Sequence, residues 1–137
     1  MRSAVLDTNV VVSGLLRSGG PPASIMDLGF SGQFRWYASE AILAEYEVVL
    51  ARKRLGIASR RAAEFFADLH ETAVVVVPAR KLHECADAND DKFLECALEA
   101  RADYVVTGNV GDFPNQFQDI RVVAPRQFLT LLTADPR

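Results

Sequence analysis

Cysteine and histidine are scarce in this chain, with only two of each among 137 residues. Cys85 and Cys96 are not in CxxC spacing, so they cannot form a disulfide scaffold. A structural zinc site is not expected either, although His83-Glu84-Cys85 carries side chains of the ligand type. Protein classes that depend on cysteine or zinc are therefore disfavoured.

Long hydrophobic runs are also missing, because no apolar stretch approaches the roughly 20 residues that span a membrane. The N-terminus has one arginine and then an acid at Asp7, which is unlike a signal peptide. We therefore expect a cytoplasmic location and no membrane partner. Gly19-Gly20 is followed by two prolines, and the glycine-rich nucleotide-binding motifs are absent.

Half of the residues are hydrophobic and 24% are charged, which is typical of a soluble globular protein. We expect one domain over residues 1–137. Helical patterns follow the strand-like segments, and Ser39 is placed to cap a long helix. This alternation predicts an α/β class, a three-layer α/β/α fold with a mainly parallel sheet of about four to five strands. The segments predicted as strands are 3–7, 34–38, 73–77, 103–107 and 120–123. The valine run within 73–77 indicates a central strand.

Acids follow several of these predicted strands. Asp7 ends the first strand, Glu45 lies in the helix after the second, Asp90-Asp91 begin a later helix, and Asp112 follows the strand that closes at Thr107. Ligands of open parallel sheets bind beyond the carboxyl ends of the strands, and right-handed crossovers bring these acids to that edge. Singly, each acid also has a structural explanation as a helix cap, a turn residue or a surface charge. Asp7 is the hardest to explain in that way, because it directly continues a buried strand.

Carboxylates gathered in one place repel one another, which raises their pKa values unless a cation offsets the charge. Ligand sets made only of oxygen suit hard ions such as Mg²⁺ and Mn²⁺. Such an ion lowers the pKa of a bound water and stabilises displacement at phosphorus. The acids therefore predict a divalent-metal site.

The net charge of −3 is unevenly distributed. Residues 52–61 contain five basic side chains and no acid, whereas residues 84–103 are mostly acidic among their charged positions. A polyanion could bind the first segment while the second holds cations. The alternative interpretation is that both segments are ordinary solvated helical faces.

Four segments of the chain, in order, resemble the motifs of the PIN-domain ribonucleases (PilT N-terminus-like), particularly the VapC-type toxins of toxin–antitoxin pairs. The segments are Val5–Val10, Ser39–Glu45, Asp87–Ala97 and Val105–Phe113. By its distance to the fourth motif, Asp91 takes the catalytic place of the third. Many relatives have Asp where this chain has Asn109, so the fourth acid is Asp112 or is missing.

This resemblance implies an endoribonuclease that depends on Mg²⁺ or Mn²⁺. The metal-binding and catalytic acids would be Asp7, Glu45, Asp91 and Asp112. Supporting residues would be Thr8, Asn9, Ser39, Asp90 and Asn109, and backbone phosphates would contact Arg52, Lys53 and Arg54. The expected partners are an RNA substrate, a small antitoxin protein and a second copy in a homodimer.

Two alternatives remain. A catalytically degenerate PIN domain would only bind RNA or a partner protein, which Asn109 favours slightly. A phosphatase of the haloacid-dehalogenase type also begins with a strand and Asp, but it needs a second acid where this chain has Asn9.

Overall fold

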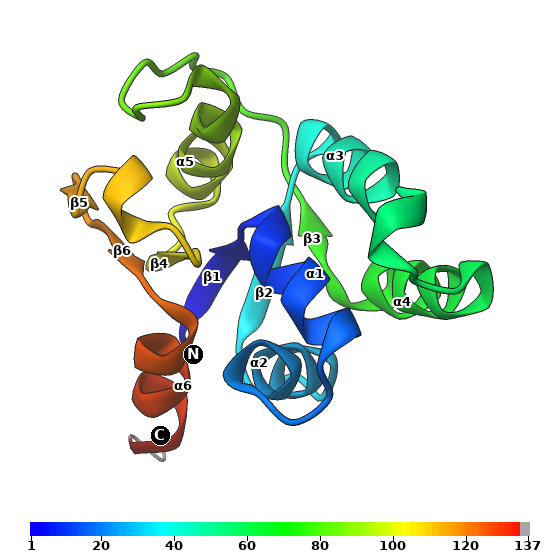
Figure 1. The fold of residues 1–137 in the computed structure, drawn as a ribbon. Helices are drawn as coiled ribbons and strands as arrows, with labels where there is room; N and C mark the ends of the chain where they lie inside the picture. The colour runs from blue at the N-terminus through cyan, green and yellow to red at the C-terminus, as the bar shows by residue number, and fades with distance from the viewer. Residues whose placement is uncertain (135–137) are drawn as a thin grey trace.

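A six-stranded sheet lies at the centre of the computed structural model, which describes residues 1–134 (Figure 1). The strand order is β3-β2-β1-β4-β6-β5, and the neighbours are parallel except for the antiparallel pair β5 and β6. The strands are β1 (Ser3–Leu6), β2 (Arg35–Ala38), β3 (Val74–Val75), β4 (Tyr104–Val106), β5 (Gln116–Phe117) and β6 (Ile120–Val123). The predicted mainly parallel sheet is confirmed. It has one more strand than predicted, because the two-residue β5 pairs with β6 across a tight turn that hydrophobic patterning does not reveal.

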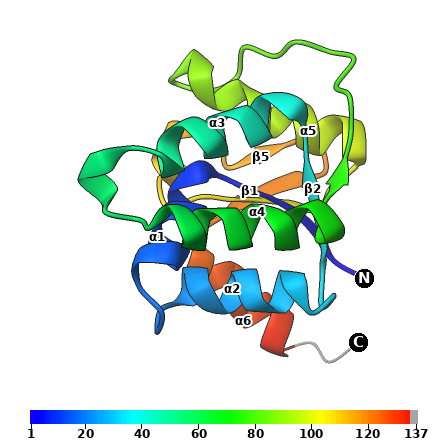
Figure 2. The same cartoon turned by 90° about the vertical axis from the view of Figure 1, so that its right-hand side faces the viewer.

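Helices cover both faces of the sheet, which confirms the predicted α/β class. Figure 2 shows α2 and α6 on one side and α3 and α5 on the other. The helices are α1 (Thr8–Leu16), α2 (Pro21–Phe30), α3 (Glu40–Leu50), α4 (Ser59–Thr72), α5 (Asp91–Ala100) and α6 (Pro125–Ala134). Single 3-10 turns occur at η1 (Lys53–Leu55), η2 (Ala88–Asp90) and η3 (Val110–Asp112). Over residues 1–134, each helix is too short or too polar to cross a membrane.

The core beneath α2 is built from aromatic side chains. The Phe34 ring lies 5.1 Å from the Phe128 ring and 6.3 Å from the Trp36 ring, measured between centroids. Gly29 of α2 faces these rings, and a Cβ at this position would lie 3.0 Å from both Phe34 and Trp36. A glycine is therefore needed for the helix to approach the sheet this closely.

The valine run was predicted as a central strand, and this prediction is wrong. β3 is an edge strand that pairs with β2 alone among the described strands, and Val74 and Val75 are about half exposed. One further backbone bond, from Val76 N–H to the Ala38 carbonyl oxygen at 2.9 Å, extends the pairing. The apolar composition of the run reports strand propensity, whereas the position within the sheet depends on the order in which strands pair.

Candidate functional site

Asp7 lies at the carboxyl end of the central strand β1. Its backbone N–H donates to the Val106 carbonyl oxygen at 2.9 Å, so the β1–β4 pairing continues to this residue. The side chain is only 6% exposed, and its Oδ2 accepts hydrogen bonds from Thr107 Oγ1 at 2.7 Å and Asn9 Nδ2 at 3.3 Å. Burial raises the pKa of Asp7, with a further contribution from the negative charge of Glu45, while the Thr107 bond acts in the opposite direction. A buried carboxylate of this kind favours a nearby cation.

Glu45 is carried to the same edge by α3, which follows β2. Ser39 begins this helix as predicted, because its Oγ accepts a hydrogen bond from Ile42 N–H at 3.3 Å. The neighbouring Tyr46 is fully buried and donates its hydroxyl hydrogen bond to the Leu6 carbonyl oxygen at the end of β1. These two contacts hold the first half of α3 against the strand that carries Asp7.

The Glu45 carboxylate lies between the starts of two other helices. One oxygen accepts a hydrogen bond from the Thr8 hydroxyl at the start of α1. The other contacts Lys92 Nζ, in the first turn of α5, at 2.6 Å. Glu45 is therefore a partly buried member of this site, and the surface-charge interpretation does not describe it.

The third motif places two adjacent acids in different surroundings. Asp91 is 4% exposed, and its Oδ1 accepts hydrogen bonds from the backbone N–H groups of Glu84 at 3.0 Å and Cys85 at 2.9 Å. It therefore holds the loop that precedes α5. Burial raises the pKa of Asp90 to about 6, with repulsion from four other acids adding to the effect. Those acids are Asp7, Asp87, Asp112 and Glu45. Burial and the repulsion of neighbouring acids therefore act on Asp90, whereas the contacts described for Asp91 are with backbone N–H groups.

The fourth motif closes the site on the β4 side. Asn109 N–H donates to Thr107 Oγ1 at 3.0 Å, and this hydroxyl in turn donates to Asp7. Asp112 is exposed at the end of η3, and its carbonyl oxygen accepts from Ala86 N–H at 3.0 Å. The contact of Asn109 is therefore a backbone one, and it orients Thr107, a buried residue within the fourth motif to which the sequence pattern assigned no role.

The predicted residues do not all gather at this edge. Asp7, Thr8, Asn9, Glu45 and Asp90 are linked by the contacts and charge effects described above. Ser39 caps α3 and has no described bond to these acids.

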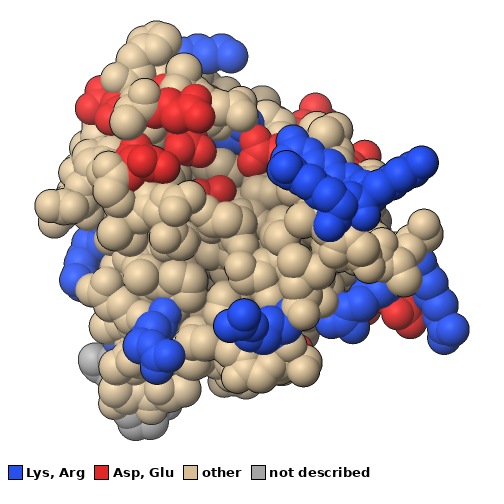
Figure 3. Space-filling view, viewed as in Figure 1, with Lys and Arg blue, Asp and Glu red and all other residues tan. Residues whose placement is uncertain are grey.

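Arg52, Lys53 and Arg54 are exposed in the connection between α3 and α4. Figure 3 shows acidic side chains gathered on the α5 side of this face and basic side chains over the α3–α4 connection. Arg61, in the same basic stretch of sequence, is used differently, because its Nε donates to the Leu15 carbonyl oxygen at 3.3 Å.

Within residues 1–134, no three His, Cys, Asp or Glu side chains are close enough together to hold a metal ion. The chemistry of the donor set nevertheless fits a hard divalent cation, since the acids contribute only oxygen, and burial together with their mutual repulsion raises the pKa of Asp90. These residues fit the ion in donor type and charge, and holding it requires the carboxylates to move together.

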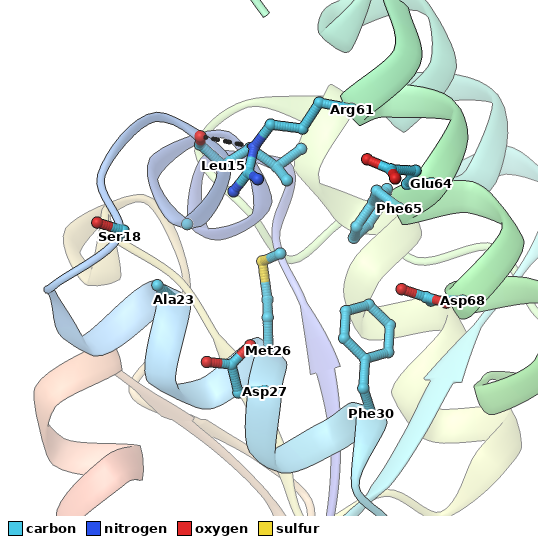
Figure 4. A pocket seen from close by; sticks show the side chains of 11 residues that line it. Leu15, Ser18, Ala23, Met26, Asp27, Phe30, Arg61, Glu64, Phe65 and Asp68 are labelled. Carbon is cyan, nitrogen blue, oxygen red and sulfur yellow. Dashed lines mark hydrogen bonds between the residues drawn. The ribbon is translucent and has the colours of Figure 1, made fainter. Parts of the chain in front are cut away.

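A separate pocket of about 370 Å³ lies between α1, α2 and α4 (Figure 4). Apolar side chains and acids both line it, including Met26, Phe30, Phe65, Asp27, Glu64 and Asp68. None of the candidate metal ligands lines this pocket.

Comparisons with known proteins identify the family. The uncharacterized protein MJ1680 of Methanocaldococcus jannaschii is 32% identical over 109 residues, which cover 77% of this chain and 69% of that protein. VapBC2 from Rickettsia felis, solved with a DNA fragment from its promoter, has a similar fold, with a TM-score of 0.58. The match covers 88% of this chain and 98% of the matched chain, at 15% sequence identity. FitAcB from Neisseria gonorrhoeae gives a TM-score of 0.54 at 19% identity over 90% and 98% of the two chains. Residues 3–111 match the family model described as the PIN domain, and the chain therefore belongs to the PIN domain family.

Proposed function

We propose that this protein is an endoribonuclease that depends on Mg²⁺ or Mn²⁺ and hydrolyses RNA phosphodiester bonds as the toxin of a toxin–antitoxin pair. PIN domains are generally nucleases. The observation that carries the proposal is the set of acids after β1 and in α3, η2 and η3, because burial, with added repulsion from these neighbouring acids, raises the pKa of Asp90 to about 6. Membership of this family removes the phosphatase alternative.

The acids that would hold the ion are Asp7, Glu45, Asp90 and Asp112. When bound, the ion lowers the pKa of a water molecule and stabilises the charge that develops on the phosphate. The chain's own residues orient the acids, since Thr107 and Asn9 donate to Asp7 and Thr8 donates to Glu45. This set differs from the one that motif spacing predicted, because Asp91 uses one oxygen to hold the backbone of Glu84 and Cys85.

We propose that RNA lies across this edge with its phosphates against Arg52, Lys53 and Arg54. These side chains are exposed, and basic and acidic residues lie on neighbouring parts of one face (Figure 3). Contacts of this kind bind the backbone without selecting a sequence. The segment therefore supports RNA affinity, while the acids support the chemistry.

The pocket in Figure 4 supports the antitoxin part of the proposal. Its apolar floor includes Met26 and Phe65, and Glu64 and Asp68 line it from α4. This combination suits a segment with apolar and basic side chains, and we propose that the antitoxin supplies such a segment. The likeness in fold to VapBC2 and FitAcB supports this assignment. The homodimer stays a prediction.

The test is cleavage of a fluorescently labelled single-stranded RNA in Mn²⁺, with the same reaction in EDTA as the background. Asp7→Asn and Asp90→Asn should each reduce the cleavage rate by about 100-fold or more, because each removes a ligand charge. Asp91→Asn should retain most of the rate, since the amide oxygen still accepts hydrogen bonds from Glu84 and Cys85. Asp119→Asn, at an exposed turn, is the matched control.

The two variants of the third motif separate the competing assignments. Loss of cleavage in Asp91→Asn with retention in Asp90→Asn would restore the assignment based on spacing. Absence of Mn²⁺-dependent cleavage in the unmodified protein, with RNA still bound, would identify the degenerate PIN domain instead. Circular dichroism spectra establish that each variant is folded before its rate is interpreted.

A further inference from the structure

A lysine ammonium group lies among the acids of the candidate site. Lys92 Nζ contacts Glu45 Oε1 at 2.6 Å, the Asn89 carbonyl oxygen at 2.6 Å and Asn89 Oδ1 at 3.1 Å. It also lies 5.6 Å from the centroid of the Phe93 ring. An ammonium group has three N–H donors, so these three oxygens can use all of its hydrogen-bonding capacity.

The pair of Lys92 and Glu45 differs from an ordinary surface ion pair. The two side chains are only 17% and 21% exposed, respectively. Both ends are also fixed by other contacts, because Thr8 holds the second oxygen of Glu45 and Asn89 holds the lysine. Ion pairs with restricted partners and limited exposure are screened less by solvent than those between mobile surface side chains.

The position of Lys92 places a positive charge where the proposed divalent metal would otherwise bind. Its ammonium joins Glu45 of α3 to the turn η2, which carries Asp90. It supplies one positive charge where several acids repel one another. A divalent ion beside Glu45 would meet this charge at short range and would have to displace it.

We propose that Lys92 is an internal counter-ion of the acidic site, which occupies the Glu45 oxygen until a divalent metal takes its place. The inference rests on the proposed function, because it requires that the acids bind a metal. It assigns two effects to Lys92: it holds the acids together in the metal-free protein, and it lowers their affinity for the metal. A residue with only a structural role would instead support metal binding, so its removal would weaken the affinity.

The experiment compares the full chain with Lys92→Met, which keeps most of the side-chain length but removes the ammonium group, and with Lys92→Arg, which keeps the charge. Lys81→Met removes a lysine from the exposed loop before α5 and serves as the matched control. Two quantities are measured at pH 7.5: the Mn²⁺ dissociation constant by isothermal titration calorimetry, and the melting temperature in EDTA and in saturating Mn²⁺.

Lys92→Met should bind Mn²⁺ about tenfold more tightly than the unmodified protein and melt at a lower temperature in EDTA. Its melting temperature should therefore rise more on addition of Mn²⁺. Lys92→Arg and Lys81→Met should bind Mn²⁺ as the unmodified protein does. Equal or weaker binding by a folded Lys92→Met would overturn the counter-ion role and leave the metal site intact.

If the unmodified protein itself bound no Mn²⁺, the metal site and the counter-ion role would both be overturned. If Lys92→Met did not fold in EDTA, Lys92→Gln would replace it, with the same expected increase in affinity. Tighter binding by Lys92→Arg would contradict the proposal, because that variant keeps the positive charge. RNA cleavage is not needed for any of these outcomes, so a protein without nuclease activity would still test the role of Lys92.

Discussion

Asp90 and Asp91 show how strongly the chemistry of a carboxylate depends on its immediate neighbours. Asp91 is paired with two backbone N–H groups, whereas Asp90 lies in the field of several other acids. Adjacent residues of the same type therefore have different surroundings, one bonded to a loop backbone and the other close to several negative charges. Motif spacing cannot distinguish them, since a shift of one residue changes the spacing very little.

Asp90→Asn should stabilise the metal-free protein at pH 7.5 and have little effect at pH 4. Folding raises the Asp90 pKa from 3.8 to about 6, so the folded state binds this proton more tightly. The resulting stability is present below pH 4 and is lost as the pH rises through 6. Asparagine has no proton to lose. The full shift corresponds to roughly 3 kcal/mol, and because Asp90 is partly exposed we expect about 1 kcal/mol.

Urea unfolding in EDTA at the two pH values measures this difference, with Asp119→Asn as the control at an exposed turn. A stability difference that does not change with pH would contradict the raised pKa. Saturating Mn²⁺ at pH 7.5 should remove the advantage of the variant, because the cation then offsets the Asp90 charge.

The contacts of α3 with the end of β1 set the positions of two of the acids, Glu45 and Asp7. α3 begins at the Ser39 cap, and Tyr46 ties the same helix to the end of β1. Local sequence predicted this helix well, since a capping serine precedes apolar residues at helical spacing. β3 was predicted less well, because strand propensity does not report whether a strand lies at the edge or the centre of a sheet.

Ser39→Ala should destabilise the protein by about 1 kcal/mol through loss of the cap on Ile42 N–H. Ser59→Ala is a matched control, because Ser59 also lies at the start of a helix, α4, whose preceding residue makes no side-chain capping bond. Urea unfolding of both variants measures the difference. An equal loss of stability in the two would mean that the Ser39 bond contributes nothing specific.

Charge is segregated on one face of the molecule even though the net charge is only −3 (Figure 3). Acids gather at the carboxyl edge of the sheet, and a basic connection lies beside them on the same face (Figure 3). A nuclease needs both, since phosphates must be held close to the groups that bind a cation. The overall charge is a poor guide to this arrangement.

Replacing Arg52, Lys53 and Arg54 together by alanine should weaken RNA binding and reduce its dependence on salt. If each residue contacts one phosphate, the slope of log K against log salt should fall by about 2 for single-stranded RNA. Fluorescence anisotropy in EDTA, which prevents cleavage, measures this slope. Arg126→Ala, on α6, should leave the slope unchanged. An unaltered slope in the triple variant would show that the basic connection is solvated surface.

The sequence alone predicted the order of the elements, the parallel sheet and the acids at the ends of strands, because each of these follows from local patterning. Asp7 and Glu45 lie where that patterning placed them. The PIN resemblance was also available from the motifs and is confirmed by the family match.

Only the tertiary structure decided which groups contact the acids. Thr107 reaches Asp7 across 100 positions of sequence, and Lys92 reaches Glu45 across 47. Asp91 differs from Asp90 in its contacts because the loop before α5 turns back and donates two backbone N–H groups to it. Hydrogen bonds and charges act over a few ångströms, so these roles depend on distances that strand pairing sets and that no local pattern of residues contains.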